Sequence, residues 1–359
     1  MSRLKRFVQL FTEKGFDAAI VSDPMNQRYL SGFDFHDGLI LVTRTQAYLL
    51  TDFRYAEAAE EKVTREMKVL LPKEGHLACI ASLLSSHGCK SACVEEAHLS
   101  YGSFLRYEKL LAPISLSVGA SQMLSSLRLH KEDGELETVA RAQKITDAAF
   151  THILNVLHPD MTEVEVALEL EYFMKKNGAE EIAFGTIAVS GTNSSRPHGT
   201  PRPCKLEKGF LTMDFGARVD GYCSDMTRTV VLGRADEEMK RLYGTVLRAQ
   251  TAALEAACEG FGCAALDRIA RDIIHGAGYE GAFGHSLGHG VGMLVHEDPR
   301  VSSGASHDSV LERGHIITVE PGIYLSGKYG CRIEDMICIR NDGSVYNFTH
   351  SPKELIELF

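Results

Sequence analysis

The sequence predicts an α+β protein with two domains: a small α/β domain followed by a larger domain built on antiparallel strands. The 359 residues exceed the usual length of one domain. Over roughly the first 120 residues, short apolar runs alternate with amphipathic stretches, as in α/β structure. Beyond them, long helical patterns mix with strand pairs joined by tight turns. We place the boundary in a serine-rich, nearly uncharged stretch, which gives domains 1–124 and 125–359.

The first domain begins with an amphipathic helix and continues as short strands. One face of the helix carries Leu4, Phe7, Val8 and Phe11. Buried strands are predicted at 18–21, 38–42 and 47–53, before a helix at 54–62.

The second domain begins with two long helices. Apolar residues keep helical spacing over 136–157. Thr162 and Glu165 form a capping box for a second helix that ends at Asn177. Further helices are predicted at 236–257 and 266–274. The predicted strands lie at 182–189, 210–219, 222–232, 315–320 and 332–340.

Composition and charge exclude several classes of protein. Apolar residues make up 44% of the chain and charged residues 24%, as in globular proteins. A net charge of −10 gives no basic footprint for nucleic acid. We expect no membrane segment and no signal peptide, because Glu13 and Lys14 interrupt the first apolar residues. Nine cysteines cannot all pair, so we expect a reduced, cytoplasmic setting.

A hairpin is the clearest local signal, and it lies within residues 210–232. Asp220 and Gly221 form a two-residue turn sequence between two strand-like runs. Such a turn fixes the register, so we expect Val219 to pair with Tyr222.

This register brings two carboxylates to one face. Gly216 then lies opposite Asp225, and Asp214 is a diagonal neighbour of Asp225 at roughly 7–8 Å between backbones. Acids on a strand are often only its solvated face. Apolar neighbours such as Phe215 and Val230 make an uncompensated acid pair unfavourable here, and a bound cation would compensate it.

Three histidines lie in the glycine-rich stretch 284–299: His285, His289 and His296. A single histidine is more often a core or surface residue than a ligand, but three in such a loop favour a site. The stretch lacks the HExxH motif, which disfavours a helical zinc-protease site.

Two glutamates complete the candidate cluster. Glu320 precedes the Pro321-Gly322 turn, and Glu334 lies within an apolar strand-like run. For either glutamate alone, a salt bridge to Arg332 is the simpler interpretation. A buried acid without a partner or a metal would be unfavourable.

Together, these residues form a candidate site for two divalent ions. The set contains four carboxylates and one imidazole: Asp214, Asp225, His289, Glu320 and Glu334. Two divalent cations balance the four negative charges. Oxygen-rich ligands favour manganese, although cobalt, zinc and iron suit the same donors.

Taken in order, the motifs resemble those of the pita-bread metallopeptidase family, in its Xaa-Pro branch of aminopeptidase P and prolidase. The matching elements are His198 in NSSRPHG, Asp214 in MDFGA, Asp225 in DMTRT, His289 and His296 in GHGVGMLVHEDP, Glu320 in VEPGIY and Glu334 in RIED. The N-terminal part is similar to the creatinase-type domain of this branch through SDPMNQRYLSGF and LLTDFRY. The resemblance implies a pita-bread catalytic domain, a creatinase-type N-terminal domain and a homodimer.

The resemblance also implies an activity and roles for the site residues. The expected reaction is exopeptidase hydrolysis of an Xaa-Pro bond by a metal-bridging hydroxide. Glu320 would bind metal and shuttle the proton, while His198 and His296 would stabilise the oxyanion. His285 would line the proline pocket, with Arg332 and Tyr324 orienting the substrate.

Other functions remain open for the same scaffold. One is a creatinase-like enzyme acting on a small guanidino compound without metal. Others are an inactive homologue that acts as a binding protein, and a methionine aminopeptidase. The complete set of ligand residues argues against the first two, and the N-terminal domain against the third.

Overall fold

The computed structural model describes all residues, Met1–Phe359, and its contacts divide the chain into two units. Unit 1 is Met1–Arg128 and unit 2 is Leu129–Phe359. This division and the expected boundary at 124/125 both fall within helix α6 (Ala120–Leu129). The serine-rich stretch, residues 115–126, therefore forms a strand and most of this helix.

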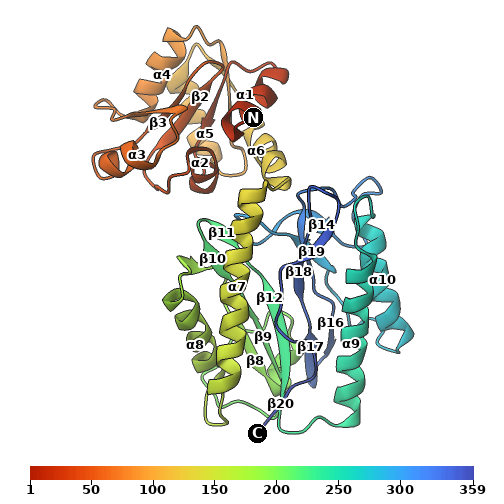
Figure 1. Cartoon of the computed structure of the whole chain (residues 1–359). Helices are drawn as coiled ribbons and strands as arrows, with labels where there is room; N and C mark the ends of the chain where they lie inside the picture. Colours follow the sequence, from red (N-terminus) through yellow and green to blue (C-terminus); the bar gives the residue numbers. More distant parts are fainter. The chain divides into compact units, whose positions relative to one another are not determined.

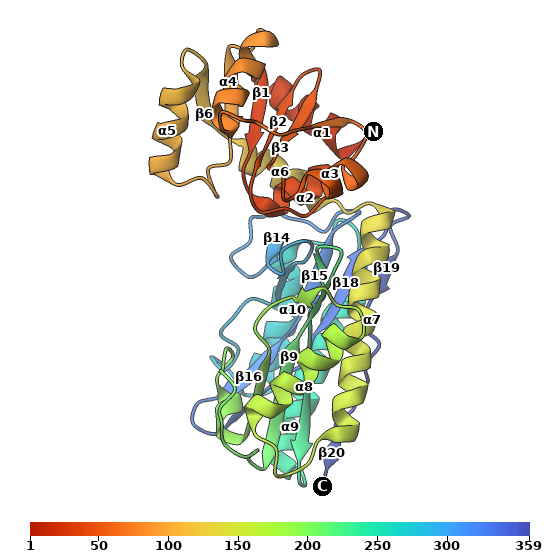
Figure 2. The same ribbon diagram turned by 90° about the vertical axis from the view of Figure 1, so that its left-hand side faces the viewer.

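Unit 1 is an α/β domain around one mixed sheet of six strands, in the order β4-β3-β2-β1-β5-β6. Its strands are β1 (Ala18–Val21), β2 (Leu39–Thr43), β3 (Ala47–Leu50), β4 (Met67–Leu70), β5 (Ser91–Val94) and β6 (Ser115–Val118). Its helices are α1 (Arg3–Glu13), α2 (Pro24–Ser31), α3 (Ala56–Lys62), α4 (His76–Ser86), α5 (Tyr101–Leu111) and α6. Helices lie on both faces of the sheet, so its central strands are apolar on both sides (Figure 2).

The predicted N-terminal elements are largely confirmed. Helix α1 buries Leu4, Phe7 and Phe11 on one face. Strand β1 has the predicted bounds, whereas β3 ends at Leu50, before the predicted end at residue 53.

Unit 2 places its strands between two pairs of helices (Figure 1). The helices are α7 (Asp133–Val156), α8 (Glu163–Lys176), α9 (Glu237–Ala256) and α10 (Cys263–Gly276), and η1 (Gly191–Ser195) is a 3₁₀ helix. The first strands are β7 (Glu181–Ile182), β8 (Ile187–Ser190), β9 (Gly209–Phe215), β10 (Ala217–Val219), β11 (Tyr222–Cys223) and β12 (Met226–Leu232). The later strands are β13 (Gly288–Gly290), β14 (Glu297–Val301), β15 (Ile316–Val319), β16 (Gly322–Leu325), β17 (Tyr329–Arg332), β18 (Asp335–Ile339), β19 (Val345–Asn347) and β20 (Glu357–Leu358).

Two sheets form the framework of unit 2. One has the order β20-β12-β9-β8 and the other β14-β13-β15-β18-β19. All their strand pairs are antiparallel except β12 with β20, so the predicted antiparallel sheet is confirmed.

Each helix pair covers one of these sheets. Helices α7 and α8 share a core with β9 and β12, and α9 and α10 share a core with β15 and β18. The capping box of α8 is as predicted, because the Thr162 side chain accepts from the Glu165 N–H and the Glu165 carboxylate accepts from the Thr162 N–H. Both pairs join a long helix to one of 14 residues, a structural repeat that the sequence does not reveal.

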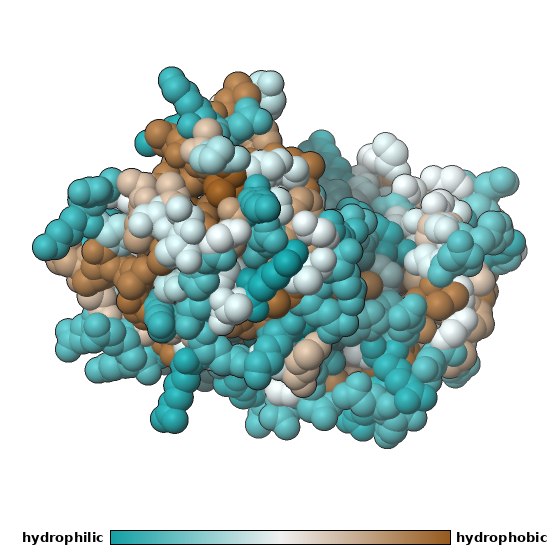
Figure 3. Space-filling model, turned by 90° about the horizontal axis from the view of Figure 1, so that it is seen from above, coloured by the Kyte–Doolittle hydropathy of each residue, from teal (hydrophilic) through white to brown (hydrophobic).

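The surface, the cysteines and the helices add three observations. Polar side chains cover most of the face in Figure 3, and apolar side chains appear on it in patches. All nine cysteines are free thiols. No helix of the structure combines the length and apolar character needed to cross a membrane.

Candidate active site

The predicted site residues converge on one cavity of about 400 Å³ in unit 2. Nine of them line it: His198, Asp214, Asp225, His285, His289, His296, Glu320, Arg332 and Glu334. Tyr324 lies behind the lining, where its hydroxyl is 3.0 Å from Nε2 of His285. The residues come from segments far apart in the chain, so the fold brings them together.

The hairpin delivers Asp214 and Asp225 in the predicted register. Val219 pairs with Tyr222, and the same register pairs Asp214 with Thr227. It places Gly216 opposite Asp225. A Cβ at Gly216 would lie 2.0 Å from the carbonyl oxygen of Ser224, so only glycine permits this approach of the strands.

Strand alternation aims the two acids away from the core beneath them. Met213 and Phe215 pack in the core of α7 and α8, and Asp214 lies between them on the opposite face. Met226 likewise enters this core directly after Asp225.

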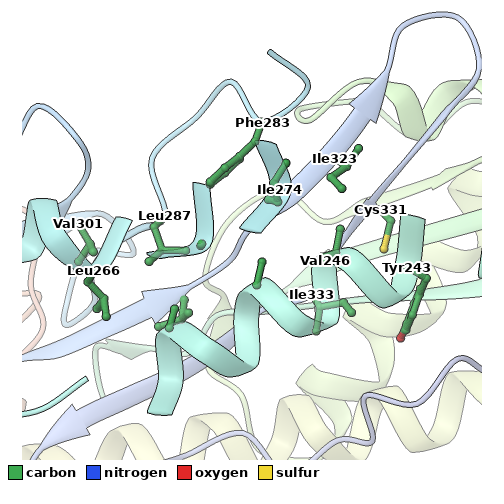
Figure 4. Packing of buried hydrophobic residues seen from close by; sticks show 14 of the residues in the cluster. Tyr243, Val246, Leu266, Ile274, Phe283, Leu287, Val301, Ile323, Cys331 and Ile333 are labelled. Atoms are coloured by element: carbon green, nitrogen blue, oxygen red, sulfur yellow. The ribbon is translucent and has the colours of Figure 1, made fainter. Parts of the chain in front are cut away.

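The second sheet and its neighbouring turns supply the remaining ligand candidates. His289 is in β13, Glu320 follows β15, and Glu334 lies between β17 and β18. Val319 and Ile333, directly before the two glutamates, are buried in the core cluster of α9 and α10, part of which is drawn in Figure 4. Apolar packing therefore fixes the backbone from which each glutamate projects.

Three donor groups are close enough to share one metal ion. Donor atoms of Asp225, His289 and Glu334 all lie within 4.8 Å of one another. Nε2 of His289 is 3.3 Å from Oε1 of Glu320 and 3.7 Å from Oδ2 of Asp225. Nδ1 of His289 is 3.1 Å from the Gly290 carbonyl oxygen. A bond to that carbonyl puts the ring proton on Nδ1, which leaves the Nε2 lone pair for a metal.

The acids strongly perturb one another without a cation. Burial, followed by repulsion from neighbouring carboxylates, raises the pKa of Asp225 and Glu334 well above the usual values. Burial also raises the pKa of Asp214, although Arg332 opposes the shift. Burial disfavours ionised Glu320 too. In the metal-free chain, a protonated His289 donates from Nε2 to Glu320 and attracts it, which outweighs burial and lowers the pKa of Glu320 to about 2.

Arg332 links two of the acids to Tyr324. Its guanidinium donates to Asp214 Oδ2 at 2.6 Å and to the Tyr324 hydroxyl at 2.7 Å. It also donates to the Thr227 hydroxyl, which donates to Glu334 Oε2 at 2.6 Å. The sequence suggested Arg332 as the salt-bridge partner of Glu320 or Glu334. In the structure, Arg332 forms its salt bridge with Asp214 instead. Oδ1 of Asp214 is buried without a hydrogen-bond partner, which leaves it free for a cation.

The other three histidines sit at the cavity wall. His198 and His296 are exposed, whereas His285 is partly buried and stacks edge-on against Phe283 at 5.0 Å. Burial lowers the pKa of His285. Partial desolvation at the cavity wall, followed by repulsion from His289, lowers the pKa of His296, so both rings are neutral near pH 7.

Sequence reasoning missed two hydroxyls that support the acids. Thr227 bonds Glu334, and Thr318 donates to Glu320 Oε1 at 3.2 Å while accepting from the His289 N–H at 3.1 Å. Thr318 lies two residues before Glu320 and Thr227 two residues after Asp225. The period of two along a strand was the signal that could have found them. The apolar lining residues Phe184, Ile187 and Val295 were also missed.

A second group of donor atoms in unit 2 is less suited to metal. His130, Glu312 and His315 have donor atoms within 4.8 Å of one another. Nδ1 of His315 accepts the Glu312 backbone N–H at 3.1 Å, which places the ring proton on Nε2. Because a ligating nitrogen must carry no proton, we assign no metal to this group.

The residues around the cavity fit divalent cations. Of the four buried or nearly buried acids, only Asp214 forms a salt bridge with an arginine. The Nε2 lone pair of His289 points among the acids, and one carboxylate oxygen has no other partner. Such a set is stable when cations neutralise it. Fold and site together therefore define a metal-dependent hydrolase with an acid-rich centre.

The chain belongs to metallopeptidase family M24, whose profile matches residues 137–341. Residues 3–130 match the profile of the creatinase/prolidase N-terminal domain. The expected pita-bread catalytic domain and creatinase-type N-terminal domain are thus confirmed, as is the assignment to the metallopeptidases.

Similar proteins extend over nearly the whole chain. An Xaa-Pro dipeptidase of Pyrococcus horikoshii is 37% identical over 357 residues, which are 99% of this chain and 98% of the relative. The structure of an Xaa-Pro dipeptidase from Bacillus anthracis superposes with a TM-score of 0.94 at 36% identity, covering 99% of both chains. An X-Pro aminopeptidase from Thermotoga maritima gives 0.90 at 34% identity, covering 97% of this chain and all of the other.

Proposed function

We propose that this chain hydrolyses the Xaa-Pro bond at the amino terminus of peptides or in dipeptides, using two divalent ions. Asp214, Asp225, His289, Glu320 and Glu334 would hold the ions. The observation that carries the proposal is the convergence of these five side chains on one cavity, with His289 aimed among the acids. Bound ions would polarise the scissile carbonyl and acidify the attacking water.

The protein groups then have distinct tasks. Glu320 lines the cavity beside His289, so its carboxylate would accept the proton of the attacking water and pass it to the leaving nitrogen. His198 and His296, at the cavity wall, would donate N–H groups to the carbonyl oxygen as its negative charge develops. The low pKa of His296 keeps its ring neutral, so it donates without adding positive charge.

Proline recognition would come from the apolar part of the cavity. Phe184, Ile187 and Val295 line it together with His285. A proline ring is a compact apolar group, and its nitrogen carries no hydrogen that the pocket would have to satisfy. Tyr324 contacts His285, and Arg332 donates to Tyr324 and Asp214, so the two residues would orient the groups that meet the substrate.

Manganese is the proposed metal, because the donors are four carboxylates and one imidazole without thiolate. A homodimer is proposed from the family resemblance. The cytoplasmic location stays a prediction from the cysteine count, and all nine thiols are free.

A metal-reconstituted assay on Ala-Pro, Ala-Pro-Ala, Met-Ala-Ala and creatine tests the function. We expect cleavage of at least one proline peptide and none of Met-Ala-Ala or creatine. Cleavage of Ala-Pro alone assigns a dipeptidase, and cleavage of Ala-Pro-Ala assigns an aminopeptidase. Turnover of creatine alone would overturn the proposal.

A further inference from the structure

Glu163 is a completely buried acid outside the cavity, at the first residue of α8. Its carboxylate accepts six hydrogen bonds: from Ser190 N at 2.8 Å and Oγ at 2.9 Å, from Asn193 Nδ2 at 2.9 Å, and from Arg202 N at 2.9 Å, Nε at 3.0 Å and Nη2 at 2.9 Å. Every donor belongs to residues 190–202, the segment that carries His198.

These bonds fix both ends of that segment. Ser190 and Asn193 precede His198 along the chain, and Arg202 follows it. The stretch between Arg196 and Arg202 has no helix or strand of its own, and the His198 side chain is exposed. The Glu163 carboxylate therefore holds this stretch in place, where no hydrogen bonds of a helix or strand do so.

Further contacts set the interior of the segment relative to the cavity. Arg332 donates to the Pro197 carbonyl oxygen at 3.2 Å, directly before His198. Asn193 donates to the Thr200 carbonyl oxygen at 3.1 Å. The segment is thus held between Glu163 on one side and the Arg332 network of the site on the other.

The charge of Glu163 matters for this arrangement. Burial alone would raise its pKa, but Arg202 and the N–H donors outweigh burial and hold the pKa below the usual value. Glu163 also lies at the N-terminus of α8, where the helix dipole favours a negative charge. A neutral amide at this position would present N–H groups to donors.

We propose that Glu163 is a positioning residue for peptide hydrolysis that acts through His198. The inference rests on the proposed function, in which His198 stabilises the developing oxyanion. Loosening the clamp displaces the imidazole from the carbonyl oxygen, and a displacement of about 1 Å is enough to lower turnover by about 100-fold. Substrate binding and metal binding use other groups.

A matched clamp on the equivalent helix provides the control. Asp267 of α10 is also completely buried and bonds Arg271 and the Leu287 N–H. Arg271 in turn donates to the carbonyl oxygens of Phe283 and His285 at 2.7 and 2.9 Å. This clamp has the same chemistry, but it holds the segment of His285.

The test is a double-mutant cycle between Glu163→Gln and His198→Ala in the metal-loaded chain. We expect Glu163→Gln alone to lower kcat by about 10- to 100-fold, with KM and bound metal within about twofold of the parent. In the His198→Ala background, it should lower kcat no further. Asp267→Asn should reduce kcat/KM by the same factor in both backgrounds.

Equal effects of Glu163→Gln in both backgrounds, or an unchanged kcat, would overturn the proposal. If Glu163→Gln does not fold, Arg202→Lys takes its place, since lysine keeps the charge but cannot form the same forked contact. Failure of the parent to cleave any proline peptide overturns the proposed function instead. Amide exchange over residues 190–202 then decides the clamp separately: faster exchange in Glu163→Gln supports it, and unchanged exchange contradicts it.

Discussion

At the residue scale, the properties of the site follow from four acids placed close together. Asp225 has no hydrogen bond to a neutral donor, and its near neighbours include Glu334, Asp214 and Glu320. A like-charge cluster of this kind raises the pKa of its members and destabilises the fold until cations bind. The same residues therefore have opposite effects on stability in the metal-free and metal-loaded chain.

The variant Asp225→Asn is expected to lose metal binding and activity. Loss of a group that only supports a metal ligand lowers metal affinity by about 10- to 100-fold. Loss of the ligand Asp225 itself should lower the affinity by more. Bound metal after dialysis and the rate of Ala-Pro hydrolysis measure this. Asp220→Asn, in the turn of the same hairpin and exposed, is the control and should match the parent. Equal metal retention in both variants would remove Asp225 from the ligands.

The pH dependence of stability gives a second signature of the cluster. The pKa of Asp225 is raised in the folded chain, so the unfolded chain releases this proton first. Stability is therefore lost as pH rises above about 4, the unfolded value. Without metal, Asp225→Asn should be more stable than the parent at pH 8, with a difference that shrinks toward pH 4. Urea unfolding at both pH values checks it, and a less stable variant at pH 8 would contradict it.

At the element scale, the hairpin of β9 to β12 sets the distance between the acids. The turn at Asp220 and Gly221 uses positive φ values of 47° and 86°, as the sequence predicts for such a turn. Gly216 then lets the strands approach where Asp214 and Asp225 must meet.

We expect Gly216→Ala to separate these strands and release metal, because its Cβ would meet backbone atoms of Ser224. Metal content and thermal midpoint report the change. Gly276→Ala, in α10 with no neighbour within 4 Å of its Cβ, is the control and should keep metal and equal or exceed the parent in stability by up to about 1 kcal/mol. Normal metal content in Gly216→Ala would show that the close approach is not required.

Arg228 joins elements at the edge of the site. It is buried, pairs with buried Asp335 at 2.8 Å and donates to the carbonyl oxygens of Ser351 and Pro352. Arg228→Met should lower the free energy of unfolding by about 3–5 kcal/mol, because it leaves Asp335 with fewer partners. Arg234→Met is the control. It removes a mostly exposed partner of Glu357 and should change the free energy of unfolding by less than about 1 kcal/mol. Urea midpoints at a fixed metal concentration compare the two variants, and similar shifts in both would contradict the prediction.

Much at this scale was predictable, because turns, caps and strand alternation are local. The hairpin register and the cap of α8 depend on residues a few positions apart. The strand predicted at 182–189 was wrong in part: it is divided into β7 and β8, since the Ala183 N–H bonds the Gly216 carbonyl and the chain bends there. The clamp of Glu163 on Arg202 spans 39 residues, so no local pattern contains it.

At the scale of the whole molecule, metal and fold are coupled. A chain that binds metal ions only when folded gains stability by mass action, about 2.7 kcal/mol for each occupied site at a metal concentration 100 times its dissociation constant. Sequence motifs predicted the ligand types and their order along the chain. Their convergence depends on the packing of two sheets against two helix pairs, which only the fold provides.

The most direct test is a titration of the metal-free chain with Mn²⁺. It follows the initial rates of hydrolysis of the proline peptide that the parent cleaves, Ala-Pro or Ala-Pro-Ala, and of the matching peptide with alanine in place of proline. We expect hydrolysis of the proline peptide to rise from the background rate to a plateau at two equivalents of metal, while the alanine peptide stays near background. A rate that does not depend on metal, or equal rates for the two peptides, would contradict the proposed function.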